Sequence, residues 1–330
     1  MAESTSNDQS TKSLVEILNI DPELAKYYLT RARWSIEGAI NEFYSDTLND
    51  TQPHGQEKPP PPTYLETVRP TSRSRMLKLL CWNLDGLDLE NLDERTVAVL
   101  ESILLKKPDV VLLQEVVDFS LKILQEKCHG YLVLAGDKLG SYFNAILIRS
   151  DTVETKETSL KVVPFEKSVM GRHYLIQPIK FFNAKIVLMT SHLESCGEYS
   201  GERKRQLSEI LDYIKRQNEN FNVIFGGDTN LRDKEVKDLG GIPMGIFDAW
   251  ESCGSELTTK YTWNMAENDN LGREFRPPPK LRFDRIFIRP AKGETAIRPN
   301  SFSLIGKERL GNCGRFPSDH WGIWLDLRVE

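Results

Sequence analysis

The chain repeatedly places a short polar stretch beside an apolar run of strand length. Five apolar runs are predicted to be strands, at residues 77–80, 109–113, 186–190, 223–225 and 280–283. The polar stretches lie at 81–86, 113–116, 191–195, 227–230, 282–285 and 318–321. Side chains at the ends of adjacent strands meet at one rim of a sheet, where polar groups are more often catalytic than structural. The sequence therefore predicts a sheet-based fold with a single catalytic rim.

The region 75–330 alternates strand-like runs with amphipathic helices. The clearest helices are predicted at 89–105, 119–127 and 202–217, and further strands at 131–135, 143–148 and 321–327. Some strands alternate apolar and polar residues, whereas residues 110–113 are apolar throughout. That mixture is typical of an α/β sandwich, in which two sheets pack together and helices cover their outer faces.

Composition excludes several classes of protein. With 330 residues, 39% of them hydrophobic, the chain can bury a large core and still form a second, small domain. No apolar run approaches the roughly 20 residues that span a bilayer, and residues 1–11 lack the apolar segment of a secretory signal. The five cysteines are odd in number and form no C-x-x-C pair. We therefore expect a reducing compartment and neither a disulfide scaffold nor a zinc ribbon.

The net charge of −5 is concentrated in the first part of the chain. Residues 1–74 hold 11 acidic and 7 basic side chains, so the remainder is nearly balanced. A near-neutral domain can still carry a local basic groove, but the sequence contains no basic tail that would coat a duplex. The charge pattern therefore favours recognition of a nucleic-acid end.

Residues 11–46 are predicted to form a three-helix module. Apolar residues recur at helical spacing, residues 13–18 give a first short helix, Asp21 and Pro22 start the second, and residues 35–39 start the third. The module resembles the ubiquitin-associated (UBA) family through Ala25, Tyr28, Leu29, Trp34, Ala39, Ile40, Phe43 and Tyr44. The resemblance implies ubiquitin or a ubiquitinated protein as a partner, although the first loop is polar. A helical bundle with another contact is the alternative.

Residues 47–74 are rich in Pro, Thr, Ser and charge. Such a segment cannot bury enough apolar surface to fold alone, so we predict a disordered linker. Within it, Pro61-Pro62-Thr63-Tyr64 fits a polyproline ligand of WW domains and equally fits a plain spacer.

Residues suited to metal and acid–base chemistry gather in the polar stretches. Glu115 ends an apolar strand, and carboxylate oxygen is the ligand that Mg²⁺ prefers. Asn83 can hold that carboxylate or a metal-bound water through its amide. Asp228 is the candidate general base for the attacking water, and Asn230 can hydrogen-bond the phosphate or the same water. The adjacent glycines 226–227 are expected to let the backbone pass close to substrate.

The motif series resembles the endonuclease/exonuclease/phosphatase superfamily of magnesium-dependent phosphoesterases, and within it the tyrosyl-DNA phosphodiesterase 2 branch. The motifs that carry the resemblance lie at 82–87, 227–233, 281–287 and 318–322. The resemblance implies a four-layered α/β sandwich over residues 75–330. It also implies Mg²⁺, with Mn²⁺ as an alternative, and we expect Glu115 and Asp85 as its ligands.

The family pattern also implies roles for the remaining polar residues. It pairs Asp284 with His320, so that a cationic His320 stabilises negative charge in the transition state together with His192. Asp319 would then bind the metal waters or the nucleophile.

Substrate contacts follow only from the resemblance. It nominates Tyr142, Arg232, Trp263 and Phe283, whose aromatic rings can stack on an unpaired 5′ end. The arginine that relatives lead us to expect at position 197 is a glycine here. Arg203 or Lys204 is the expected replacement for its grip on DNA.

The reaction implied by the resemblance is hydrolysis of the 5′-phosphotyrosyl bond between DNA and a topoisomerase II peptide, leaving a 5′-phosphate, in double-strand break repair. A phenol with a pKa near 10 leaves with little acid assistance, which suits a site without a dedicated general acid. Such a substrate implies a nuclear, also cytoplasmic, monomer without membrane contact. Two alternatives stay open: another superfamily phosphodiesterase, either an abasic-site endonuclease or a deadenylase, and a ubiquitin-binding adaptor with an inactive nuclease-like domain.

Overall fold

The computed structural model describes residues 10–12, 14–15, 22–32, 34–36, 39, 75–136, 142–272 and 276–330. The chain separates into two units, residues 1–69 and 70–330. Within the described ranges, every helix is too short or too polar to cross a membrane. The predicted linker 47–74, with its Pro-Pro-Thr-Tyr stretch, lies outside the described residues.

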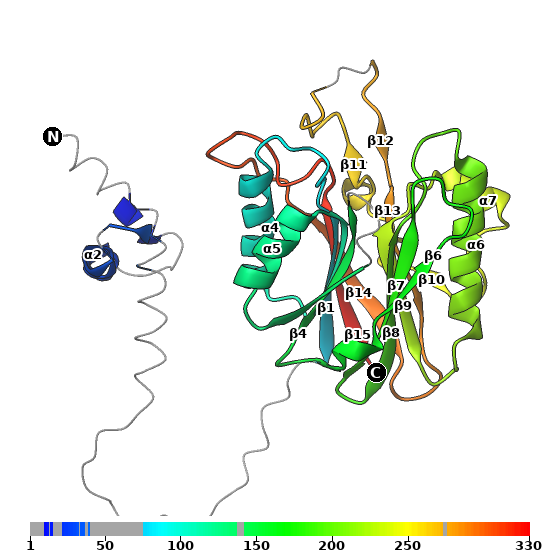
Figure 1. Cartoon of the computed structure of the whole chain (residues 1–330). Helices are drawn as coiled ribbons and strands as arrows, with labels where there is room; N and C mark the ends of the chain where they lie inside the picture. The colour runs from blue at the N-terminus through cyan, green and yellow to red at the C-terminus, as the bar shows by residue number, and fades with distance from the viewer. Residues whose placement is uncertain are drawn as a thin grey trace, which may run out of the picture. The chain divides into compact units, whose positions relative to one another are not determined.

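Two sheets packed face to face form the centre of the second unit (Figure 1). The first sheet has the strand order β14-β15-β1-β2-β4-β3. Its strands are β1 (Met76–Asn83), β2 (Val110–Val116), β3 (Tyr131–Ala135), β4 (Phe143–Arg149), β14 (Ile297–Ile305) and β15 (Gly322–Val329). The second sheet has the order β10-β13-β9-β8-β7-β5, and β6 pairs with β7. Its strands are β5 (Glu154–Thr155), β6 (Lys161–Pro164), β7 (His173–Phe181), β8 (Ala184–His192), β9 (Asn222–Asp228), β10 (Phe247–Asp248) and β13 (Asp284–Arg289).

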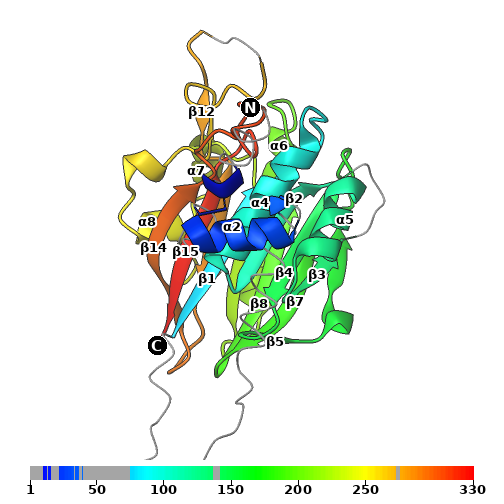
Figure 2. The same ribbon diagram turned by 90° about the vertical axis from the view of Figure 1, so that its left-hand side faces the viewer.

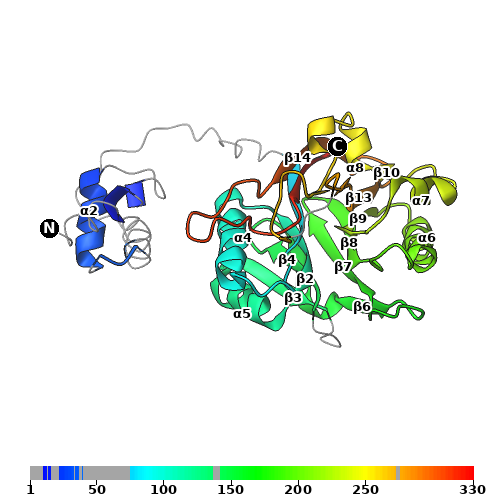
Figure 3. The ribbon, with the colours of Figure 1, turned by 90° about the horizontal axis from the view of Figure 1, so that it is seen from above.

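Helices cover the outer face of each sheet (Figures 2 and 3). The first sheet is covered by α4 (Leu92–Lys106) and α5 (Asp118–Lys127). The second is covered by α6 (Ser200–Arg216), with the short α7 (Asp233–Asp238) beside it. Short helical turns complete the unit: α8 (Ala249–Ser252), η1 (Glu157–Ser159) and η2 (Leu257–Thr259). The predicted four-layered α/β sandwich is confirmed.

The apolar run of β2 follows from this layering. Val110 and Leu112 pack into the core between the two sheets, whereas Val111 and Leu113 pack against the helices. All four side chains are buried. Because both faces of the strand are covered, alternation with polar residues is absent.

The strand predicted at 280–283 is confirmed only at its first two residues. Lys280–Leu281 is β12, which pairs with β11 (Trp263–Asn264) in a separate two-stranded ribbon. A new strand, β13, starts at Asp284 and runs antiparallel to β9. Between them the Phe283 carbonyl accepts hydrogen bonds from the backbone N–H and hydroxyl of Thr229. Asp284 therefore begins a strand, yet it still lies opposite Asp228 at the same rim.

In the N-terminal unit, α2 (Pro22–Arg31) begins at Pro22 as predicted. Its buried apolar cluster consists of Leu14, Ala25, Tyr28, Leu29 and Ala39. Much of the predicted first and third helices lies outside the described residues.

Candidate active site

Strands from both sheets end at one rim and place the polar motifs there. Asn83 is the last residue of β1, and His192 and Asp228 are the last residues of the parallel neighbours β8 and β9. Asp284 starts β13 opposite Asp228. His320 precedes β15, which runs antiparallel to β1. Strand direction and pairing thus bring residues distant in sequence to one place.

A hydrogen-bonded cluster around Asp228 joins the two sheets. The Asn83 amide Nδ2 donates to Asp228 Oδ2 at 2.9 Å and to Glu115 Oε1 at 3.2 Å. His192 Nε2 lies 3.2 Å from the same Asp228 oxygen. The Asn230 backbone N–H donates to Asp228 Oδ1 at 3.0 Å. Both oxygens of Asp228 are therefore held in a fixed orientation.

His320 pairs with Asp284. The distance from His320 Nδ1 to Asp284 Oδ2 is 2.7 Å, and His320 Nε2 lies 3.8 Å from Asp228 Oδ2. Burial by itself lowers the pKa of His320, but Asp284, Asp319 and Asp228 together raise this pKa well above its ordinary value. His320 is therefore a cation at neutral pH.

His192, which was expected to stabilise negative charge together with His320, is not a second cation. Burial first, and then the nearby Arg172 guanidinium, lower the pKa of His192 to about 3. The imidazole is neutral at working pH, so it acts on its neighbours through hydrogen bonds rather than through charge.

Three of the four predicted substrate contacts form one face beside His320. The Trp263 and Phe283 rings lie 5.4 Å apart, and the Phe283 ring lies 6.4 Å from the His320 ring. Arg232 Cζ sits 5.2 Å over the Phe283 ring. Trp263 Nε1 also donates to Asp319 Oδ2 at 3.0 Å, so this aromatic face is tied to the catalytic rim.

The fourth contact, Tyr142, stands next to an arginine that sequence reasoning missed. The Tyr142 ring lies 6.0 Å from the His192 ring, and Arg172 Cζ lies 5.0 Å over the Tyr142 ring. Two Arg172 nitrogens, Nε and Nη1, are buried and have no hydrogen-bond partner within the described part of the chain. The buried Glu194 carboxylate holds the turn before Arg172 by accepting from Ser168 Oγ and the N–H groups of Val169 and Met170. Arg172 thus adds a buried positive charge beside Tyr142 and His192, and only its place just before β7 could have identified it.

Arg203 cannot replace the arginine that was expected at position 197, so this prediction is wrong. Its guanidinium is fully buried, pairs with Glu235 at 2.6 Å and donates to backbone carbonyls of the 194–196 turn. Lys204 Nζ lies 3.8 Å from Asp238. Arg203 therefore supports the turn and is not available to DNA.

The glycines at 226–227 also have a packing role that the sequence did not reveal. A Cβ on Gly227 would lie 2.0 Å from the Ser191 carbonyl oxygen of the neighbouring strand, and one on Gly226 would meet Leu112 at 2.9 Å. These positions therefore need glycine for packing inside the sandwich, and close approach of the backbone to substrate stays a prediction.

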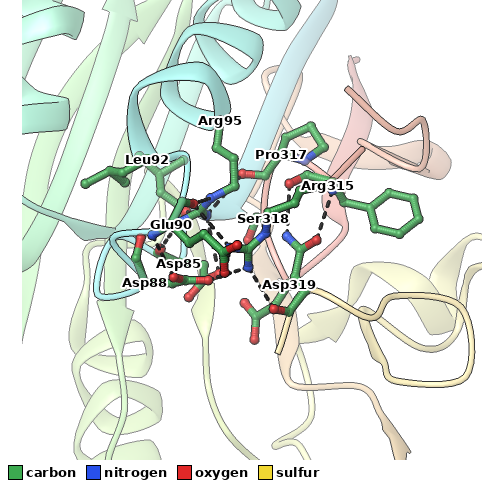
Figure 4. Close-up of polar contacts among 12 residues, drawn as sticks. Asp85, Asp88, Glu90, Leu92, Arg95, Arg315, Pro317, Ser318 and Asp319 are labelled. Atoms are coloured by element: carbon green, nitrogen blue, oxygen red, sulfur yellow. Dashed lines mark hydrogen bonds and ion pairs between the residues drawn. The ribbon is translucent and has the colours of Figure 1, made fainter. Parts of the chain in front are cut away.

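Two buried arginines hold the loops on either side of the rim (Figure 4). Arg95 of α4 is fully buried, and Arg315 pairs with Asp88 and Glu90 in the loop after β1. The Arg95 guanidinium donates to carbonyl oxygens of both loops, at Leu84, Asp85, Asp88, Glu90 and Pro317. The loop that carries Asp85 is thereby fixed beside the segment that carries Asp319.

Comparison with known proteins fits this geometry. Residues 80–320 match the family model "Endonuclease/Exonuclease/phosphatase family". The chain belongs to this family. Residues 8–48 match the model of a UBA-like domain.

Several members of the endonuclease/exonuclease/phosphatase family resemble the chain over most of its length. Tyrosyl-DNA phosphodiesterase 2 of Homo sapiens is 37% identical over 335 aligned positions, which cover 95% of this chain and 90% of the human protein. The structure of D. rerio TDP2 complexed with single strand DNA product matches with a TM-score of 0.73 at 41% identity, covering 77% of this chain and 99% of that one. TDP2 from C. elegans matches with a TM-score of 0.69 at 30% identity, covering 98% and 93%.

Phosphodiesterases of the endonuclease/exonuclease/phosphatase family depend on metal, and the carboxylates at this rim fit a cation. Burial and the neighbouring Asp319 raise the pKa of Asp85 to about 8 and that of Glu115 to about 7. Asp85 pairs with Arg95 at 3.3 Å, but this one cation does not offset three carboxylates. A divalent ion would relieve the repulsion, and carboxylate oxygens are the donors that hard cations prefer.

Two further groups of side chains could contribute metal ligands, because their ligand atoms lie within 4.8 Å of one another. They are Glu115, His192 and Asp228, and Asp228, Asp284 and His320. In the second group the 2.7 Å pair occupies Asp284 Oδ2 and His320 Nδ1. Glu115 belongs to the first group and also to the carboxylate cluster with Asp85, so it is the best supported ligand.

Proposed function

We propose that this chain hydrolyses the phosphotyrosyl bond between a protein tyrosine and a DNA 5′ end, leaving a 5′-phosphate. The observation that carries the proposal is the Asp228 carboxylate, held between Asn83, His192 and the cationic His320. The relatives named tyrosyl-DNA phosphodiesterase 2 supply the substrate class.

Asp228 is the proposed general base. It accepts the proton of the water whose oxygen attacks phosphorus, while the bond from phosphorus to the tyrosine oxygen breaks on the opposite side. The phenolate leaves with the bonding electron pair. Because the pKa of a phenol is near 10, the site needs no dedicated acid for this step. The hydrogen bonds from Asn83 and from the Asn230 N–H orient the base.

Charge on the phosphate is stabilised from two sides of the base. His320 is held cationic by Asp284 and can hydrogen-bond a phosphate oxygen through Nε2. On the other side, the Arg172 guanidinium lies over the Tyr142 ring and adds positive charge near His192. The aromatic faces of Tyr142 and of Trp263 with Phe283 suit the leaving tyrosine ring and the terminal base.

Mg²⁺ is the proposed metal, with Mn²⁺ as an alternative. Glu115 and Asp85 would hold it, and Asp319 would contribute directly or through water. When bound, the ion supplies positive charge that offsets the developing charge on the phosphate oxygens.

The proposed biological substrate is a DNA 5′ end that carries a topoisomerase II peptide, repaired during double-strand break repair. We further propose that the protein is a monomer that acts in the nucleus and also in the cytoplasm. The UBA-like module is proposed to bind ubiquitin or a ubiquitinated adduct.

Three oligonucleotides distinguish this reaction from its rivals. The full chain is incubated with 5′-tyrosyl DNA, abasic-site DNA and an adenylated RNA tail, with Mg²⁺ or with EDTA. The 5′-tyrosyl substrate should be cleaved fastest, only with metal, and not by Asp228→Asn. Comparable cleavage of the abasic or RNA substrate would replace the proposal by the corresponding endonuclease or deadenylase. Absence of cleavage with all three would favour the ubiquitin-binding adaptor.

A further inference from the structure

A second set of aromatic and cationic side chains alternates near the aromatic face of the active site. Arg282 Cζ lies 4.6 Å over the Trp250 ring. Lys260 Nζ lies 5.8 Å from the Trp250 ring and 5.5 Å from the Tyr261 ring. Lys280 Nζ lies 5.0 Å from the same Tyr261 ring. The five side chains form a cation–aromatic series.

The outer end of this series opens into a pocket of about 270 Å³. Tyr261, Lys280 and Lys307 line it; both lysines are exposed and Tyr261 is half-buried. Glu267 is the acidic residue in the lining, and it lies 3.5 Å from Lys307. Lys260, which reaches the same ring, is 3.4 Å from Asp233. Positive charge therefore exceeds negative charge in the lining of this pocket.

The pocket adjoins the proposed site of reaction. Lys280 and Leu281 form β12, where Leu281 pairs with Trp263, the residue bonded to Asp319. Tyr261 precedes Trp263 by two residues, so their Cα atoms lie within about 7 Å. Figure 1 shows the ribbon of β11 and β12 standing at the rim, beyond the ends of the two sheets.

We propose that Tyr261, Lys260, Lys280 and Lys307 form a second nucleic-acid subsite, which binds nucleotides beyond the one that carries the scissile bond. The Tyr261 ring stacks on a base, and the exposed ammonium groups of Lys280 and Lys307 contact phosphates. Sites for single strands combine these two features, because every base has a face that can stack and every phosphate carries charge. The subsite rests on the proposed function, since it extends the strand held at the catalytic rim.

The turn before α6 does not supply the cationic contact to DNA that the resemblance implied. Position 197 has no side chain, and Arg203 is buried in its pair with Glu235. The turn before α6 therefore lacks the expected arginine grip on DNA. The series around Tyr261 supplies positive charge near the Trp263 and Phe283 face, where exposed lysines and a half-buried ring occur together.

The test compares substrates of different length with the double variant Lys280→Gln/Lys307→Gln in the full chain with Mg²⁺. The substrates are the p-nitrophenyl ester of thymidine 5′-phosphate, which has one nucleotide, and a 12-nucleotide 5′-tyrosyl strand. The variant should leave kcat/KM unchanged for the one-nucleotide ester and lower it about tenfold at low salt for the strand. The slope of log kcat/KM against log salt should become shallower by about 1.4, because two phosphate contacts are lost.

Lys122→Gln/Lys127→Gln on α5 is the matched control, because it removes the same charge from exposed lysines on a helix that covers the first sheet. Its kinetics should follow the unmodified protein on both substrates. Tyr261→Leu should lower kcat/KM for the strand about fivefold with an unchanged salt slope, since it removes stacking and no charge.

Unchanged kinetics of the lysine variant on the strand would overturn the subsite and leave the lysines to an acidic protein partner. An equal loss on both substrates would also overturn it, because the defect would then lie in catalysis. If the unmodified protein cleaves neither substrate, the proposed function fails and the subsite falls with it.

Discussion

Two buried histidines beside one carboxylate carry different charges in this site. His320 and His192 both approach Asp228 Oδ2, at 3.8 Å and 3.2 Å. Asp284 lies against the far nitrogen of His320, whereas Arg172 is the nearby charge for His192. One imidazole is therefore a cation and the other a neutral hydrogen-bonding group. The sequence alone does not distinguish the two histidines. Their charges are set by neighbouring side chains that only the fold brings together.

Removing the carboxylate that holds His320 cationic should make activity dependent on pH. In Asp284→Asn the pKa of His320 should fall, because the largest favourable charge is lost. We expect kcat/KM on 5′-tyrosyl DNA to fall by about 10²–10³-fold at pH 8, and by less at pH 6, where the imidazole can still protonate. The check is a pH–rate profile together with a histidine NMR titration of both proteins. An unchanged profile would show that His320 does not act through its charge.

The raised pKa values of Asp85 and Glu115 predict how metal removal changes stability. These values are about 8 and about 7. A carboxyl group whose pKa is higher in the folded than in the unfolded chain stabilises the fold below its unfolded pKa, and this contribution is lost as pH rises through the folded value. In EDTA we expect Tm to fall by about 5 °C between about pH 5 and pH 8.

Two measurements separate this effect from general pH sensitivity. Mg²⁺ at pH 8 should restore most of the lost Tm, because the ion offsets the repulsion between the carboxylates. Glu115→Gln should show a smaller decrease between the two pH values, since one of the titrating groups is gone. A Tm that is flat with pH in EDTA would contradict the arrangement of carboxylates at this rim.

At the scale of elements, the sequence predicts the strands that are covered on both faces and misses those that contain proline. The run 110–113 is apolar because helices and the second sheet cover it, and this pattern predicts the strand observed as β2. β7 and β14 contain Pro178 and Pro299, which lack the N–H that a ladder uses. Pro299 lies at an irregularity in the pairing with β15. Missing β7 also hid Arg172, which directly precedes it.

Alanine substitution at two glycines should change stability to very different degrees, because only one of them lies in the close contact between β8 and β9. In Gly227→Ala the new Cβ would lie 2.0 Å from the Ser191 carbonyl, a backbone atom that cannot move without shifting the strand. We expect this variant to lose about 3 kcal/mol or more of unfolding free energy, at the upper end of the range for overpacking. Gly197→Ala meets no atom within 4 Å and should change stability by less than about 0.5 kcal/mol. Urea unfolding of both variants makes the comparison, and equal midpoints would contradict it.

At the scale of the whole molecule, the site exists only where the two sheets meet. Glu115 comes from the first sheet, whereas His192, Asp228 and Asp284 come from the second. The order of motifs in the sequence predicts that they share a rim, because each lies at one end of a strand. It does not predict which carboxylate meets which histidine, since those pairs depend on how the sheets pack across the interior.

Because the chain forms two separate units, we predict that catalysis and the proposed ubiquitin binding can be separated. The N-terminal apolar cluster and the cores of the sandwich share no residues, and every described residue of the catalytic rim lies between 83 and 320. A protein of residues 70–330 should therefore keep kcat/KM on a 5′-tyrosyl strand within about twofold of the full chain, and it should lack the proposed ubiquitin binding. Steady-state kinetics and NMR titration with labelled ubiquitin measure the two properties. A loss of activity of about tenfold or more in a fragment with an unchanged Tm would show that the first unit takes part in the reaction.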